Sequence, residues 1–480
     1  MTDIWTHDGW EMVVGLEVHV ELATATKLFS ASPNRFGDEP NTNIDPVTLG
    51  LPGALPVLNR QAVELAMRIG LALNCTVQPC TFARKNYFYP DMPTSYQISQ
   101  YEDPINIDGH LDLPDGSRVG IERAHLEQDA GKSTHVGGGA GGRVHGAEAS
   151  LIDLNRAGVP LVEIVSRPDI RSPEQAKAYV AELRAILLAI GASDAKMEEG
   201  SMRVDANVSV RRPGDEFGTR CEIKNVNSVR SVGRAIDYEA RRQIALIEGG
   251  EQVRQQTRHW DEGDGRTHTL RDKEDADDYR YFLEPDLVPL APSDEWIEQV
   301  RSSLPMLPAA RRERLAAASG LAVDSEAVAV LVERGQDDFA FAVDEAGGDL
   351  TTAVKRLSQL SADLDVANVS AEHVAELTVM ERDGELTASQ ATTVLDELVD
   401  NGADGDGPRE IAAAHGFEAM DTSELESMVD DAIAAQPDAW AKFCAGEGKA
   451  MGALVGHIMK ASRGQADGKL VSQLLDQRKP

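Results

Sequence analysis

The sequence has few cysteines and no pair spaced to bind a metal. Its four thiols, Cys75, Cys80, Cys221 and Cys444, are scattered over 480 residues without a CxxC motif. A small secreted scaffold held by disulfides needs a much denser pattern. The sequence therefore favours a reducing compartment, and we expect a cytoplasmic protein.

Long hydrophobic runs are also missing. The most apolar stretches, 47–58 and 65–73, are too short to cross a bilayer, and Arg68 interrupts the second. Residues 1–10 are polar and acidic, without the cationic start and apolar run of a signal peptide. We expect no membrane partner.

Positive charge is scarce. The chain has 47 Lys and Arg against 80 Asp and Glu, a formal net charge of -33. Nucleic-acid binders usually carry a basic balance, because they neutralise phosphates. An acidic surface also suits concentrated salt, where the Debye length shrinks to roughly 3 Å near 1 M and repulsion of RNA is screened. The charge thus indicates a habitat and does not decide the function.

The length and the residue patterns predict two or three domains. Residues 1–292 mix alternating strand patterns with helices, one at 173–190 capped by Ser172 and one at 232–248 capped by Ser231. Residues 293–400 and 409–480 have helical spacing, and 401–408 read as a hinge. We expect an α+β domain followed by helical middle and tail domains.

The segment 14–22 alternates apolar and polar residues. On a strand, Glu17, His19 and Glu21 share one face. Two carboxylates and an imidazole suit Mg²⁺ or Mn²⁺. Any half-exposed strand shows the same alternation, so by itself the segment favours ordinary solvent exposure.

Two further segments carry polar clusters. Residues 125–133 contain Glu127 and Asp129, but their Gly-Lys-Ser lacks the first glycine of a phosphate-binding loop. The glycine run at 137–142 predicts a flexible loop. On a strand at 203–211, Arg203, Asp205 and Asn207 share one face, which could serve a metal-bound nucleotide or simply face solvent.

Cations gather near the end of this acidic chain. Lys460, Arg463 and Lys469 could contact an RNA backbone. Cations near helix C-termini are also common for structural reasons, so the signal is modest.

Together, long sequence words point to one family. They are VGLEVHVEL (14–22), FARKNYFYPDMPTSYQISQ (82–100), HLEQDAGKSTH (125–135), KMEEGSMRVDANVSVR (196–211) and GALVGHIMKASRGQADGKLVSQLL (452–475). With these words, and others between them, nearly the whole chain resembles the B subunit of aspartyl/glutamyl-tRNA amidotransferases.

The resemblance implies a fold and a reaction. The first domain would be a cradle with an antiparallel sheet, distantly similar to glutamine synthetase and guanidino kinases. With ATP and Mg²⁺ it would phosphorylate the side-chain carboxylate of Asp or Glu attached to tRNA. Ammonia from glutamine would then displace the phosphate, which makes the enzyme a carbon–nitrogen ligase. A glutamine amidase (the A subunit), a small C subunit and misacylated tRNA would be its partners in a heterotrimer.

The resemblance also assigns roles to residues. The metal ligands would be Glu17, His19, Glu127 and Asp205. The catalytic group would consist of Glu17, His19, Glu127 and Asp129. ATP phosphates would contact Arg203, Asp205 and Asn207. Lys85 and Tyr87 would lie at the mouth of an ammonia channel, and Lys460, Arg463 and Lys469 would bind tRNA.

The chain departs from the family pattern at a few positions. Gln128 replaces a second Glu, and Thr94 replaces a Lys found in many members. Asp45 and Thr48 stand where some members have zinc-type cysteines, so we expect no zinc. A non-catalytic tRNA-binding scaffold is the alternative, supported only by Gln128. The archaeal Glu-specific paralogue needs an insertion for which residues 207–290 leave no room. Whether Asp-tRNA, Glu-tRNA or both are substrates stays open.

Overall fold

The computed structural model describes residues 5–137, 147–272, 276–360, 366–417, 422–462, 466 and 468–479. The chain divides into two compact units, Met1–Pro308 and Ala309–Pro480. Most of the glycine run expected to be a loop, and Arg463, lie outside the described residues. In the described part of the chain, no helix has the length and hydropathy to cross a bilayer.

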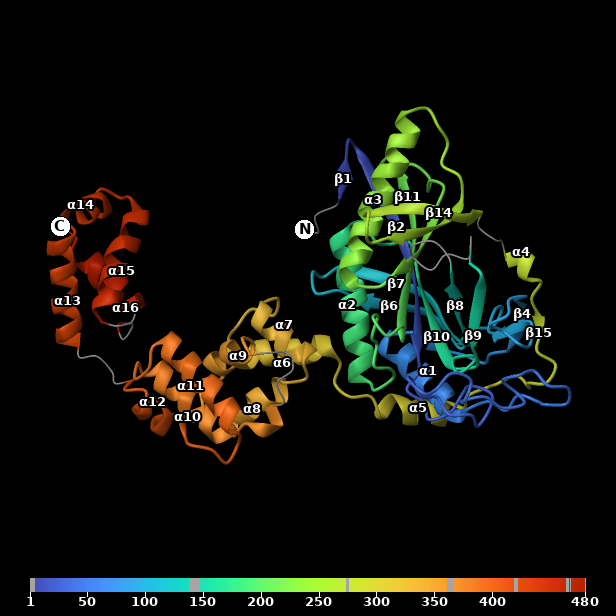
Figure 1. The fold of residues 1–480 in the computed structure, drawn as a ribbon, viewed down its shortest axis with the longest axis horizontal. Coiled ribbons are helices and arrows are strands. Elements are labelled where there is room, and N and C mark those ends of the chain that lie inside the picture. Colours follow the sequence, from blue (N-terminus) through green and yellow to red (C-terminus); the bar gives the residue numbers. More distant parts are fainter. Residues whose placement is uncertain are drawn as a thin grey trace. The chain divides into compact units, whose positions relative to one another are not determined.

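The first unit is built around a ten-stranded sheet (Figure 1). Its order is β14-β13-β12-β11-β2-β10-β7-β6-β3, with β1 paired to β2. The described strands pair antiparallel, except β12 and β13, which are parallel. The strands are β1 (Thr6–His7), β2 (Trp10–Glu21), β3 (Thr76–Val77), β6 (Asn106–Asp112), β7 (Arg118–Gln128), β10 (Pro160–Ser166), β11 (Met202–Arg211), β12 (Cys221–Val226), β13 (Gln256–Asp261) and β14 (Arg266–Asp272).

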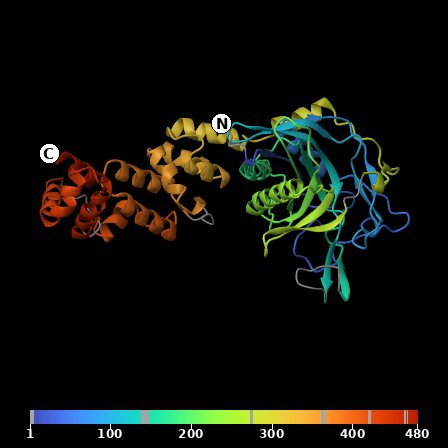
Figure 2. The same ribbon diagram turned by 90° about the horizontal axis from the view of Figure 1, so that it is seen from above.

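Smaller sheets accompany the large one. One has the order β15-β4-β5, from Phe282–Leu283, Ala83–Asn86 and Tyr96–Ser99. The other is a two-stranded ribbon of β8 (Lys132–Val136) and β9 (Ala149–Asp153), which projects from the unit in Figure 2.

The alternation predicted for β2 is confirmed. Leu16, Val18 and Val20 are fully buried, while the polar residues between them face the opposite side of the sheet. The apolar face packs against α1 (Arg60–Ala72), α2 (Pro173–Ala189) and α3 (Val229–Glu248) in one hydrophobic core. The polar face of the sheet is therefore available for a functional site.

Helix caps position these helices. The Ser172 side chain accepts a hydrogen bond from the Gln175 backbone N–H, with Pro173 in the first turn, as the sequence predicts. The cap predicted for the next helix is wrong. Helix α3 begins at Val229, because Ser228 accepts from the Ser231 backbone N–H and takes the cap three residues earlier.

The end of the first unit is helical. Helix α4 spans Ala276–Tyr279, and α5 spans Asp294–Ser302. Trp296 of α5 donates its indole N–H to Glu64 of α1 at 3.1 Å and packs on the same core. The domain boundary expected at residue 292 thus falls before a helix that packs on the first unit.

The second unit consists of helices in its described part. They are α6 (Pro308–Ser319), α7 (Glu326–Glu333), α8 (Asp337–Glu345), α9 (Leu350–Leu357), η1 (Val366–Asn368), α10 (Ala371–Arg382), α11 (Ala388–Asn401), α12 (Pro408–Ala414), α13 (Thr422–Ala435), α14 (Pro437–Cys444), η2 (Gly448–Ala450), α15 (Met451–Ala461) and α16 (Gly468–Gln477). Residues 315–412 and 425–475 contribute separate hydrophobic clusters. A sheet-centred unit followed by helices confirms the predicted α+β class.

Candidate active site

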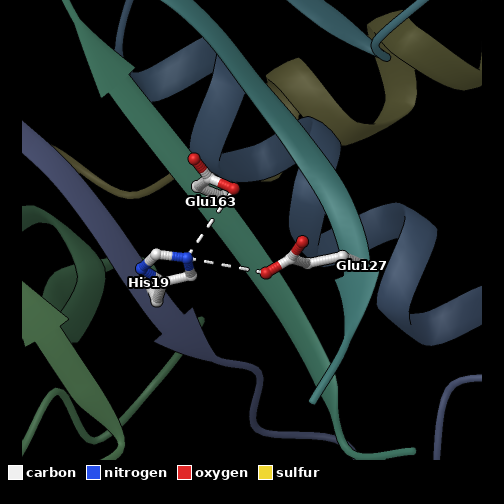
Figure 3. Close-up of side chains that lie close together, drawn as sticks. All are labelled: His19, Glu127 and Glu163. Carbon is white, nitrogen blue, oxygen red and sulfur yellow. Dashed lines mark ion pairs between the residues drawn. The ribbon is translucent and has the colours of Figure 1, made fainter. Parts of the chain in front are cut away.

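Three side chains from three neighbouring strands converge on the polar face of the sheet (Figure 3). Nε2 of His19 on β2 lies 3.6 Å from Oε1 of Glu127 on β7 and 3.6 Å from Oε2 of Glu163 on β10. Their ligand atoms all lie within 4.8 Å of one another. Because β10 runs between β2 and β7, the sheet itself fixes this arrangement.

A second imidazole lies against the same carboxylates. Glu163 is the strand partner of both His19 and His125. Nε2 of His125 lies 3.4 Å from Glu163 and 3.9 Å from Glu127. The Ser99 hydroxyl donates to Glu127 at 3.3 Å. These contacts orient both carboxylates toward one point.

Burial sets the protonation of this cluster. Burial raises the pKa of Glu127, and the negative charge of Glu163 raises it further. Burial also acts to raise the pKa of Glu163, but His125, His19 and Lys85 outweigh it and lower that pKa. Burial lowers the pKa of His125 to about 4, so this imidazole is neutral at pH 7.

The donor set fits a hard divalent cation. Two carboxylates and a neutral imidazole are the ligands that Mg²⁺ or Mn²⁺ accepts. A cation between Glu127 and Glu163 would also offset the repulsion that raises the pKa of Glu127. Both carboxylates are largely withdrawn from solvent, which is costly without a positive partner.

The cluster opens into a cavity of about 400 Å³. Predicted site residues from several elements line it: Lys85, Tyr87, His19, Glu127, Asp129, Arg203 and Asp205. Asp129 accepts from Arg203 at 2.7 Å and lies 3.4 Å from Arg156. Burial, followed by the charge of Asp129, raises the pKa of the neighbouring Glu21 to about 7.

Asp205, which also lines the cavity, is paired. Nζ of Lys224 lies 2.6 Å from Asp205 and 3.3 Å from Glu222. Burial acts to lower the pKa of Lys224, but these two carboxylates outweigh it and raise the pKa. The ammonium is thus held positive at the cavity wall, where a phosphate could contact it.

Glu17 and Asn207 lie beside a neighbouring cavity. Asn207 donates its amide to Glu17 at 2.8 Å, and both line a separate space of about 190 Å³ with Phe217 and Arg220. The structure therefore brings His19 and Glu127 of the predicted ligands together, puts Asp205 on the same cavity, and puts Glu17 on the adjoining one. Their roles stay predictions.

The positions that depart from the family lie away from the cluster. Glu127 and Gln128 are successive on β7, so their side chains point to opposite faces. Gln128 lines a small cavity with Lys27, Met92 and Thr94. The substitution at 128 thus leaves the three converging ligands in place.

The cation positions of the tail are described in part. Lys460 is exposed on α15, and Lys469 lies in the first turn of α16. Arg463 lies outside the described residues.

Sequence reasoning missed Glu163 and His125 as members of the cluster. Glu163 interrupts the apolar run of β10, where Val162 and Ile164 are fully buried. A single carboxylate inside such an apolar strand indicates a charge that is paired in the fold, because a buried charge needs a partner.

Comparison with known proteins identifies the family of this chain. A family model described as the GatB/GatE catalytic domain matches residues 12–298, and one described as the GatB domain matches residues 350–478. The B subunit of the aspartyl/glutamyl-tRNA(Asn/Gln) amidotransferase of Corynebacterium diphtheriae is 49% identical over 98% of this chain and 96% of its own length. The protein of the same name from Nocardia farcinica is 50% identical over 97% of this chain and 95% of its own length. The chain therefore belongs to the family of B subunits of tRNA-dependent aspartyl/glutamyl amidotransferases.

Proposed function

We propose that this chain activates the side-chain carboxylate of Asp or Glu esterified to tRNA(Asn) or tRNA(Gln), using ATP and Mg²⁺. The product of the complete reaction is Asn-tRNA(Asn) or Gln-tRNA(Gln). The convergence of His19, Glu127 and Glu163 beside a cavity that also contains Arg203 and Lys224 carries the proposal.

The chemistry requires two displacements. A carboxylate is a poor acyl donor, so its oxygen first attacks the γ-phosphorus of ATP, and the bond to the β-γ bridging oxygen breaks to release ADP. The lone pair of ammonia then attacks the acyl carbon. The carbon–oxygen bond to phosphate breaks, inorganic phosphate leaves, and the nitrogen loses a proton to give the amide.

In this proposal the cluster of His19, Glu127 and Glu163 binds the metal ion. Mg²⁺, held by His19, Glu127 and Glu163 with Asp205 or Glu17 as further candidates, would neutralise charge on the phosphates. Side chains of the protein would stabilise the transferring phosphoryl group. Arg203 and Lys224 present fixed cations to the transferring phosphoryl group, and Asp129 orients Arg203 through their 2.7 Å contact.

The two cavities suggest where each substrate binds. Lys85 and Tyr87 line the larger cavity, so the aminoacyl end and ammonia would enter there. Asn207, which with Glu17 lines the smaller cavity, would contact ATP there. Both substrates then meet at the cluster.

Partners follow from the same reaction. Because ammonia must come from glutamine, we infer an amidase, the A subunit of the complex, that delivers it past Lys85 and Tyr87. Together with a small C subunit, the two would form a cytoplasmic heterotrimer. Lys460, Arg463 and Lys469 of the tail would contact the body of the misacylated tRNA.

The test is transamidation by the three mixed subunits with ATP, Mg²⁺ and glutamine. Asp-tRNA(Asn) and Glu-tRNA(Gln) are supplied separately, and amide formation and ADP release are measured. Amide formation on at least one tRNA, with ADP release that depends on that tRNA, is the expected result. If the wild-type complex binds tRNA but forms neither amide nor ADP, the scaffold alternative stands instead.

A further inference from the structure

An aromatic cluster that the proposed function leaves without a role borders the main cavity. The rings of Tyr101 and Tyr281 stack with centroids 4.2 Å apart and planes 7° apart. The ring of Tyr279 meets that of Tyr281 edge-on at 6.1 Å. Nζ of Lys85, which lines the cavity, lies 4.6 Å from the centre of the Tyr279 ring. The cluster thus adjoins the wall of the cavity through Lys85.

One end of the cluster is within electrostatic range of Glu127 and Glu163, and the other end reaches solvent. Burial raises the pKa of Tyr281, and the charges of Glu127 and Glu163 raise it further, so this phenol lies within electrostatic range of the two carboxylates. Tyr101, stacked on its other face, is 46% exposed. An aromatic side chain stacked on Tyr281 is therefore open to solvent.

The backbone between Tyr279 and Tyr281 is strained, and hydrogen bonds from a neighbouring side chain fix it. Arg280 has a positive φ of 47°, which is unfavourable for a residue with a side chain. The amide of Asn86 donates to the carbonyls of Tyr279 and Arg280 at 2.8 and 3.0 Å and fixes this turn. Strain of this kind persists where surrounding contacts enforce it, and it is concentrated at functional sites.

Cations accompany the exposed rings. The guanidinium of Arg280 lies 5.8 Å from the centre of the Phe88 ring, which is 67% exposed. Lys85 and Arg280 stand out in a chain with a net charge of -33. Exposed aromatic faces interleaved with cations are what single-stranded nucleic acids bind, because bases stack and phosphates pair.

We propose that the Tyr101–Tyr281 stack binds the base of the unpaired 3′-terminal nucleoside that carries the amino acid. This inference rests on the proposed function, because the amino acid is esterified to the ribose of that nucleoside. With the side-chain carboxylate at the metal cluster, the base lies only one ribose and one amino-acid backbone away. The exposed side chain of Tyr101 is joined to this site through Tyr281, Tyr279 and the cavity residue Lys85, and Lys85 and Arg280 are cations available to the adjoining phosphates.

The test uses the complete three-subunit enzyme with tRNA whose terminal adenine is replaced by fluorescent 2-aminopurine. Stacking on tyrosine quenches this base. Quenching is expected with wild type and with Tyr101→Phe, which keeps the aromatic face, and is expected to be lost with Tyr101→Ala. The KM for misacylated tRNA should rise about 5- to 150-fold in Tyr101→Ala, the range expected for one base stack, while the KM for ATP stays unchanged. Phe36→Ala, which removes another exposed ring (79% exposed), is the control and should change neither value.

Two results would overturn the proposal. One is unchanged quenching and unchanged KM for tRNA in Tyr101→Ala. The other is weakened association of Tyr101→Ala with its partner proteins at an unchanged KM for tRNA, which would make this face a protein interface. Because quenching is read with uncharged tRNA, it is independent of catalysis. If wild type quenches the base but forms no amide, the proposed function fails while this site stands.

Discussion

His19 and Glu163 are direct strand partners on β2 and β10, and Nε2 of the imidazole lies 3.6 Å from a carboxylate oxygen. Ladder hydrogen bonds therefore set the separation of two candidate ligands, and no loop is involved. Sites built on sheet strands hold their groups more precisely than sites built on loops. Replacing one ligand should therefore weaken metal binding, because the backbone of the sheet does not move to compensate.

Glu163→Gln should raise the Mg²⁺ concentration that supports half-maximal activity. The amide keeps the size of the side chain but removes an anionic oxygen from the cluster. We expect a shift of at least about 10- to 100-fold, the range seen when even the outer partners of metal ligands are removed. The measurement is ADP release dependent on misacylated tRNA, over a Mg²⁺ titration.

The control for this change is Glu174→Gln. Glu174 is exposed on α2, and its carboxylate lies 3.4 Å from the Lys177 ammonium. The variant should follow the wild-type Mg²⁺ curve. Identical curves for wild type and Glu163→Gln would remove Glu163 from the ligand set.

Asp205→Asn should affect ATP more than Mg²⁺. Asp205 is paired with Lys224 at 2.6 Å, so its loss removes the shorter of the two contacts that position the ammonium for phosphate. We expect a higher KM for ATP and a Mg²⁺ shift smaller than that of Glu163→Gln. A larger Mg²⁺ shift than that of Glu163→Gln would instead make Asp205 a principal metal ligand.

Lys27→Met should change how stability depends on pH. Burial lowers the pKa of Lys27 to about 8, although Asp45 and Asp153 act to raise it. Between this pKa and the unfolded value of about 10.4, the folded wild type binds fewer protons than the unfolded chain, so raising the pH stabilises it. The stability advantage of Lys27→Met over wild type should therefore shrink by about 2–3 kcal/mol from pH 8 to pH 10. Chemical denaturation at both pH values measures it.

Lys177→Met is the matched control, because this lysine on α2 is more accessible to solvent than the buried Lys27. Its stability relative to wild type should hardly change over the same interval. If the Lys27→Met difference also stays constant, the ammonium of Lys27 is not destabilised in the folded protein.

Lys460→Ala should weaken tRNA binding equally for all tRNA substrates. The residue is exposed near the end of α15, and removing one phosphate contact should reduce the salt dependence of log K by about one unit. Binding of tRNA at several salt concentrations measures the slope. Lys355→Ala, on α9, serves as the comparison and should keep the wild-type slope.

The sequence predicted the polar face of β2 but not the distances between the strands. Alternation in residues 14–22 predicts which side of β2 is polar, because side chains on a strand alternate. It does not tell which strands become neighbours. Placing β10 between β2 and β7 is a matter of tertiary pairing, and that placement inserts Glu163 between His19 and Glu127.

The same reasoning explains Gln128. In the sequence, residues 127–129 look like one acidic cluster with a missing charge. On β7, Gln128 points to the opposite face and lines a different cavity, with Lys27 and Thr94. The boundary of α3 shows a similar limit, since Ser228 and Ser231 are both good caps and local sequence does not choose between them.

The central place of β2 in the sheet has a consequence for synthesis. This strand is synthesised well before its long partners β10 and β11, which begin at residues 160 and 202. Until then both of its edges lack those partners, and pairings of such high sequence separation form slowly. An unfinished chain that ends before β11 has no complete cradle, so it should neither bind ATP nor compete for misacylated tRNA. Until β11 has been synthesised, such a chain is prone to aggregate.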